Sequence, residues 1–173
     1  MKRLSLLRHA KSSWSGNNLK DRERPLNKRG ERDAPYMGSR LLARKLRPSL
    51  IITSPAVRAV TTARYIAEAL GYPFEFVQRE RELYLASPRV IFDVLAAQDD
   101  NFNDLLLVGH NPGLTDIVNQ LLPELPLDNL PTAGVVCVES AADTWAEITK
   151  AKVELVFFDY PKNPETLIIE KQG

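Results

Sequence analysis

The sequence predicts an α/β fold in three layers, with a mainly parallel central sheet, helices on both faces and an antiparallel strand at one edge. Short apolar runs alternate along the chain with segments of helical periodicity. Several of these runs are continuously apolar, as strands are when helices cover both faces of a parallel sheet. The last two runs have less helix between them, so we expect an antiparallel pairing at one edge of the sheet.

Six apolar runs are predicted to be strands, and turn residues such as Ser54 and Pro55 end them. The shortest is FEFV, and the most continuous is LLLV. In chain order, the expected strands lie at residues 3–7, 49–55, 74–77, 104–110, 133–139 and 152–161.

Four segments carry apolar residues at helical spacing, and three of them have recognisable ends. Asn27 and Ser87 are N-cap residues, and Pro88 suits the first helical position. Gly71 suits the left-handed residue that follows a helix. In chain order, the expected helices lie at residues 27–46, 56–71, 87–98 and 111–122.

Length and charge narrow the class of protein. The 173 residues predict one domain spanning residues 1–173. The net charge of +1 gives no reason to expect a nucleic acid or a membrane surface as partner. The sequence leaves the oligomeric state open.

Cysteine and histidine are scarce. The single cysteine, Cys137, rules out an intramolecular disulfide and fits a reducing compartment. The N-terminal apolar run is short and interrupted by Arg8, unlike a signal peptide, and no stretch approaches the ~20 apolar residues of a membrane helix. We therefore expect a cytoplasmic protein. Two histidines and one cysteine argue against a zinc site, and we expect no cofactor.

Both histidines fall at the carboxyl ends of predicted strands. His9 follows the first strand and His110 follows the LLLV strand, while Arg58 comes shortly after Ser54 at a third strand end. In open α/β sheets, ligands bind outside this edge. Taken alone, His9 would be a semi-exposed residue after a strand; the three strand ends together favour a shared site.

The chemistry of this set favours phosphoryl transfer. An arginine fork matches phosphate oxygens, and a neutral histidine is a nucleophile. Arg8 and Arg58 supply two forks. Arg24, in the polar loop 11–25, is a third candidate, with Arg22 as its rival.

These residues resemble those of the histidine phosphatase (phosphoglycerate-mutase-like) superfamily. The resemblance rests on Arg8-His9-Ala10, where the family has Arg-His-Gly, and on four segments: RPLNKRG, SPAVRAVTTA, LLLVGHNPGL and LPTAGVVCVE. It covers nearly the whole chain, and the absence of a large inserted cap is most similar to the SixA-type phosphohistidine phosphatases. It implies a phosphoglycerate-mutase-like fold.

The resemblance also implies roles for the residues. His9 attacks phosphorus and forms a phosphohistidine intermediate, without metal. Arg8, Arg58, Arg24 and His110 hold the phosphoryl oxygens. Many members also use a carboxylic acid to protonate the leaving group; Glu82 is the first candidate here and Glu80 the second. SixA-like members lack this acid, and its absence would favour a phosphoramidate substrate.

Three functions remain open at this point. The leading one is a phosphatase acting on phosphohistidine in a protein. The second is a phosphatase or mutase of small phosphorylated metabolites. The third is a phosphate-binding module without catalysis.

Overall fold

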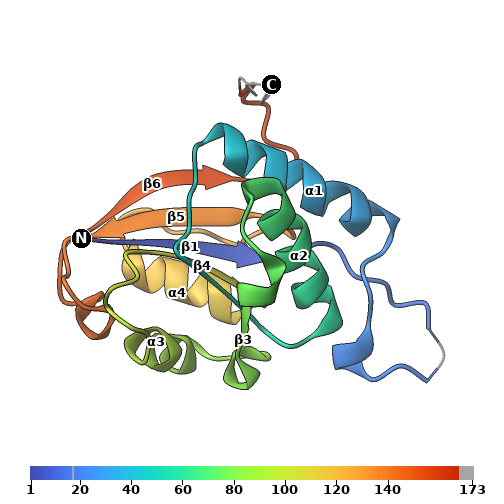
Figure 1. Ribbon diagram of the computed structural model, residues 1–173, viewed down its shortest axis with the longest axis horizontal. Coiled ribbons are helices and arrows are strands. Elements are labelled where there is room, and N and C mark those ends of the chain that lie inside the picture. The colour runs from blue at the N-terminus through green and yellow to red at the C-terminus, as the bar shows by residue number, and fades with distance from the viewer. Residues whose placement is uncertain (17, 168–173) are drawn as a thin grey trace.

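The computed structural model describes residues 1–16 and 18–167; Asn17, in the predicted loop, and residues 168–173, at the end of the predicted domain, lie outside the described residues. A six-stranded sheet crosses the molecule in the order β3-β2-β4-β1-β5-β6 (Figure 1). The strands are β1 (Lys2–Arg8), β2 (Leu50–Thr53), β3 (Gln78–Arg79), β4 (Asp104–Gly109), β5 (Val135–Ser140) and β6 (Val153–Asp159).

The strand directions confirm the predicted sheet. Strands β1, β2, β3 and β4 pair in parallel, and β5 pairs antiparallel with both β1 and β6. Neighbouring side chains of β1 point to opposite faces, so Leu6 joins one hydrophobic core and Leu7 the other. This two-sided burial explains why β1 does not alternate strictly between apolar and polar residues.

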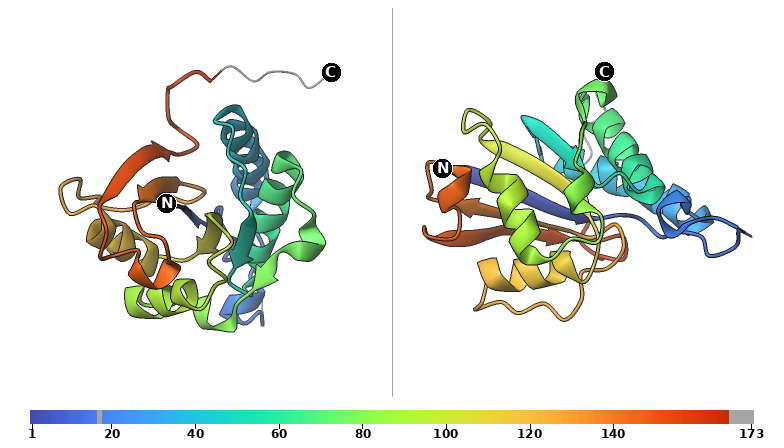
Figure 2. Two further views of the ribbon diagram at one scale, coloured as in Figure 1. Left: turned by 60° about the vertical axis from the view of Figure 1, so that its left-hand side comes forward. Right: turned by 90° about the horizontal axis from the view of Figure 1, so that it is seen from below.

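Helices cover both faces of the sheet. They are α1 (Lys28–Ala43), α2 (Val57–Leu70), α3 (Pro88–Ala96) and α4 (Gly113–Leu121). Helices α1 and α2 pack on one face, and α3 and α4 on the other (Figure 2). The three predicted layers are therefore confirmed.

The predicted helix ends are also confirmed, with one difference in length. The side chain of Asn27 accepts a hydrogen bond from the backbone N–H of Gly30, and Ser87 caps α3 in the same way. Gly71 follows α2 with φ of 69°. Helix α1 ends at Ala43 instead of residue 46, because Lys45 turns the chain with φ of 60°.

The strand predicted at residues 74–77 is wrong. Phe74–Phe76 forms a 3₁₀ turn, and the strand that follows it, β3, consists of Gln78 and Arg79 alone. Phe76 is 64% exposed, so this apolar run is not buried in the sheet. A short apolar run on the surface has the same amino-acid composition as a buried strand. The sequence alone does not distinguish the two.

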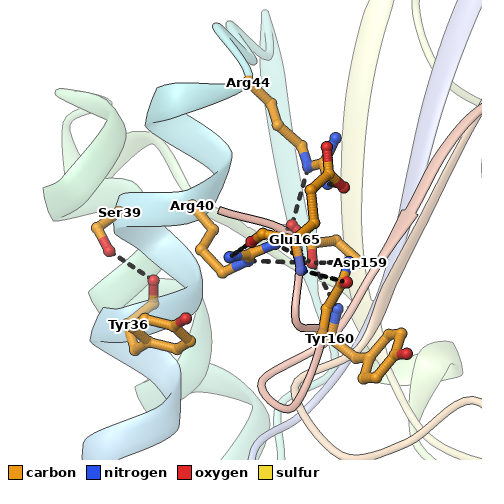
Figure 3. Close-up of polar contacts among 8 residues, drawn as sticks. Tyr36, Ser39, Arg40, Arg44, Asp159, Tyr160 and Glu165 are labelled. Carbon is orange, nitrogen blue, oxygen red and sulfur yellow. Dashed lines mark hydrogen bonds and ion pairs between the residues drawn. The ribbon is translucent and has the colours of Figure 1, made fainter. Parts of the chain in front are cut away.

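The end of β6 is fastened to α1 by ion pairs (Figure 3). Asp159 is fully buried and accepts hydrogen bonds from Nε of Arg40 at 3.0 Å and Nε of Arg44 at 2.8 Å. Arg44 also contacts Glu165 at 2.9 Å, beyond the strand. Burial alone would raise the pKa of Asp159, but these hydrogen bonds hold it below its usual value. The network holds the segment after β6 against α1.

None of the helices in residues 1–16 and 18–167 combines the length and the apolar character required of a membrane span.

Candidate active site

The two histidines meet at the carboxyl edge of the sheet. Arg8 pairs with Gly109 at the ends of β1 and β4, so the residue that follows each strand is a histidine. The ring centroids of His9 and His110 are 5.1 Å apart. Arg58 lies in the first turn of α2, after β2. The three predicted strand ends therefore come together.

These strand ends form one wall of a cavity of about 330 Å³. The five residues predicted to bind or transfer phosphate all line it: Arg8, His9, Arg24, Arg58 and His110. The loop after β1, which extends beyond the carboxyl edge of the sheet in Figure 1, adds Lys11, Ser12, Trp14 and Asp21. Leu85, Asn111 and Thr132 complete the lining.

His9 is buried and held in one tautomer. Its Nδ1 lies 2.7 Å from the carbonyl oxygen of Ala10. Because a carbonyl oxygen only accepts, Nδ1 carries the proton and Nε2 keeps its lone pair. Burial lowers the pKa of His9 to about 4, and the charges of Arg58 and Arg8 act in the same direction. The imidazole is therefore neutral at physiological pH, as a nucleophile must be.

Alanine causes no strain at position 10. Ala10 is fully buried, and it is not among the described residues with positive φ. Its backbone N–H donates to Oγ1 of Thr62 at 3.0 Å. Glycine is therefore not required for the backbone conformation at this position.

His110 is oriented by Ser54. Its Nε2 lies 2.7 Å from Oγ of Ser54, while its Nδ1 is buried and has no hydrogen-bond partner among the described residues. The ring of Tyr84 meets it edge-on, with centroids 5.6 Å apart. Burial lowers the pKa of His110 to about 3, reinforced by His9 and Arg58. A hydroxyl donating to Nε2 would leave Nδ1–H free to donate to a ligand.

Hydrogen bonds hold the three arginines in place. Arg58 is 3% exposed and donates from Nη1 to the backbone oxygen of Asp21 at 2.7 Å and from Nη2 to Oδ2 of Asp21 at 3.0 Å. Arg24 donates from Nη1 to Oδ1 of the same carboxylate at 2.9 Å. Arg8 donates from Nη1 to the carbonyl of Leu130 at 2.9 Å, and its buried Nε has no partner among the described residues.

Asp21 is thus the carboxylate that lines the cavity, and it is ionised. A hydrogen bond from Tyr84 lowers its pKa to about 2, together with those from Arg58 and Arg24, although partial burial acts in the opposite direction. Among residues 1–16 and 18–167, no cluster of three His, Cys, Asp or Glu side chains could hold a metal ion. The positive charge of the cavity comes from its basic side chains.

Comparison with known proteins finds a family to which part of this arrangement is similar. The model of the histidine phosphatase superfamily (branch 1) matches residues 4–87, which include His9, Arg24 and Arg58. A crystal structure of SixA from Agrobacterium tumefaciens, assigned as a phosphohistidine phosphatase, is 27% identical with a TM-score of 0.76, covering 92% of this chain and 98% of its own. Residues 4–87 therefore match the histidine phosphatase superfamily, and the fold of nearly the whole chain is similar to that of SixA.

The family match and the likeness to SixA support a phosphatase with the phosphoglycerate-mutase-like fold. The protein histidine phosphatase SixA in complex with tungstate shares the fold, with 19% identity, a TM-score of 0.79 and coverage of 94% of this chain and 99% of its own. An uncharacterized protein of Mycobacterium tuberculosis, Rv1276c, is 28% identical over 165 residues, which cover 90% of this chain and 100% of that protein. These likenesses support a phosphorylated substrate in general.

The structure does not bring the predicted acid to the cavity. Glu82 lies in the 3₁₀ turn Arg81–Leu83, which buries Leu83 and leaves Glu82 exposed, away from the cavity lining. Glu80 accepts a hydrogen bond from Gln78 and is likewise absent from the lining. The expectation for both residues depended on their distance along the chain from Arg58, and the local turn places them elsewhere.

Sequence reasoning missed two polar side chains of the site, Asp21 and Tyr84. Asp21 stands three residues before Arg24 in the charged segment KDRERP, where a carboxylate looks like a solvated charge. Tyr84 follows the expected acid by two residues. Of the two rival arginines, Arg24 lines the cavity, whereas Arg22 is exposed and contacts the Tyr84 ring.

Proposed function

We propose that the chain is a metal-independent phosphatase of phosphohistidine in proteins, acting through a covalent phosphohistidine intermediate on His9. The site belongs to a single histidine-phosphatase domain over residues 1–173 that works in the cytoplasm. The protein substrate, the intermediate and the roles of individual residues are our inference from the geometry of the cavity.

The reaction has two displacements on phosphorus. In the first, Nε2 of His9 attacks the phosphorus atom as the P–N bond to the substrate imidazole breaks, and that imidazole leaves with the bonding pair and a proton. In the second, the oxygen of a water molecule attacks phosphorus, and the bond to Nε2 breaks. Inorganic phosphate is released and neutral His9 is restored.

The basic side chains stabilise the charge on the transferred group. Arg8, Arg58 and Arg24 approach its oxygens, and His110 donates through the buried Nδ1 that has no partner among the described residues. Preorganised donors of this kind contribute about 3 kcal/mol each to transition-state stabilisation. Arginine stays charged at any working pH, which supplies the positive charge without a metal.

One observation supports a phosphoramidate substrate: the cavity offers no protonated carboxyl group among the described residues. Asp21 is ionised and bonded to Arg58, Arg24 and Tyr84, and Glu82 lies outside. An alkoxide leaving group needs an acid. The imidazole of phosphohistidine needs none from the enzyme, because its second ring nitrogen takes up a proton near neutral pH.

A substrate panel with chelator present tests the proposal. We expect kcat/KM for a phosphohistidine peptide to exceed that for sugar phosphates by at least about tenfold, since the alkoxide reaction lacks its acid. The reverse ranking would make the chain a phosphatase of small metabolites. Binding of phosphate with no turnover of any substrate would make it a binding module.

A further inference from the structure

Trp14 stands at the cavity with its side chain in solvent. It is 78% exposed, the largest fraction among the exposed large hydrophobic residues of the described chain. Its ring nevertheless has a fixed partner: Cζ of Arg24 lies 3.4 Å from the ring centroid. Both residues line the cavity, so an indole is presented where a substrate enters.

The orientation of the indole is set by Arg24. The guanidinium donates from Nε to the carbonyl of Ser13 at 3.0 Å, from Nη1 to Asp21 at 2.9 Å, and from Nη2 to the hydroxyl of Ser12. These three hydrogen bonds to separate partners hold the guanidinium in place, and the indole lies against it. Trp14 is therefore preorganised, although most of its surface is open.

A second apolar side chain reaches the same wall from another segment. Leu85 is 56% exposed, lines the cavity and has φ of 48°, in the left-handed region that leucine rarely adopts. Its neighbour Tyr84 contacts the His110 ring. Strained backbone of this kind persists where the surroundings impose it and is concentrated at functional sites.

We propose that Trp14 and Leu85 form a subsite for a flat ring on the leaving group, so that the enzyme selects phosphoryl groups whose leaving group carries an aromatic ring at or next to the bond that breaks. This inference rests on the proposed function, in which that ring is the imidazole of phosphohistidine. In-line attack by His9 places the leaving group on the outer side of the phosphoryl group, toward the mouth of the cavity. A ring bonded to phosphorus lies there, within reach of an indole that already stacks on a planar cation.

Matched substrates and variants test the subsite. Phosphoramidate and a phosphohistidine peptide both have a P–N bond, but phosphoramidate has no ring; p-nitrophenyl phosphate has a ring on oxygen. In Trp14→Leu, we expect kcat/KM to fall about fivefold to tenfold for the two ring substrates and to stay within about twofold for phosphoramidate. Trp14→Phe keeps an aromatic face and should retain most of the wild-type value. Leu85→Ala should show a smaller loss with the same ranking.

Phe76→Ala is the control, because Phe76 is an aromatic residue exposed to a similar degree that does not line the cavity. If Trp14→Leu lowers kcat/KM equally for substrates with and without a ring, or lowers it for neither, the proposed subsite is wrong. Failure of the wild type to hydrolyse phosphohistidine would refute the proposed function instead. The p-nitrophenyl phosphate comparison would still decide whether Trp14 recognises a ring.

Discussion

Asp21 holds both ends of the Arg58 fork: Nη1 donates to its backbone oxygen at 2.7 Å and Nη2 to its Oδ2 at 3.0 Å. The same carboxylate accepts from Arg24. A negative charge therefore sits against two of the arginines assigned to phosphate. It keeps the two guanidinium groups in place and also repels an incoming anion.

Replacing this charge should strengthen the binding of phosphate. In Asp21→Asn we expect Ki for inorganic phosphate to fall about fivefold, because the amide keeps the size of the carboxylate and removes its charge close to the bound anion. Inhibition by phosphate at constant ionic strength measures the change. Unchanged or weaker inhibition would show that Asp21 acts only by positioning the arginines.

Arg24 and Arg22 form a matched pair in the same segment. Arg24→Ala should raise KM for a phosphohistidine peptide about tenfold, because a charge-assisted donor of the cavity is lost. Arg22→Ala should leave KM unchanged, since Arg22 does not line the cavity. Steady-state kinetics of the two variants side by side check this. Similar values in both would contradict the placement of Arg24 against the substrate.

The sequence was sufficient to predict the layers of the fold and the residues that lie at the strand ends. Buried parallel strands carry apolar residues on both faces, so β1 and β4 could be located, and sheet geometry then placed His9 beside His110. Asn27 and Gly71 followed from the chemistry of helix ends.

The remaining features depend on tertiary contacts that no local pattern encodes. Phe74–Phe76 is an apolar run on the surface, and Glu82 is turned outward by a 3₁₀ turn beginning one residue before it. Asp21 enters the site because a loop folds back over Arg58 from a distant part of the chain. Its role in the cavity is visible only once that fold is known.

The two histidines should remain neutral well below the ordinary histidine pKa. Because the molecule has only His9 and His110, NMR titration of the ring resonances can follow both. We expect no titration between pH 8 and pH 5, since burial lowers their pKa values to about 4 and about 3. A midpoint near 6.5 for either ring would contradict the burial of the pair.

The same shifts set the direction of a stability change. Between the unfolded pKa of about 6.5 and the folded values, the unfolded chain binds more protons than the folded one. The free energy of unfolding that depends on keeping both histidines neutral is thus fully present above pH 6.5. It decreases as the pH falls toward 4.

Glu82 should be dispensable. Because its side chain is exposed and outside the cavity lining, Glu82→Gln should change kcat on a phosphomonoester by less than about twofold. A loss of a hundredfold or more, the contribution expected of a general acid, would show that the turn moves during the reaction. Glu75→Gln, at another exposed position in a 3₁₀ turn, is the control.

The central claim is that His9 carries the phosphoryl group, and trapping the intermediate tests it most directly. The enzyme is mixed with a phosphohistidine peptide in the presence of chelator, quenched without acid, digested and analysed by mass spectrometry. We predict an acid-labile phosphate on the peptide that contains His9, no such label in His9→Ala, and turnover reduced at least about a thousandfold in that variant. Label on any other residue, or equal turnover by the wild type and His9→Ala, would contradict the account.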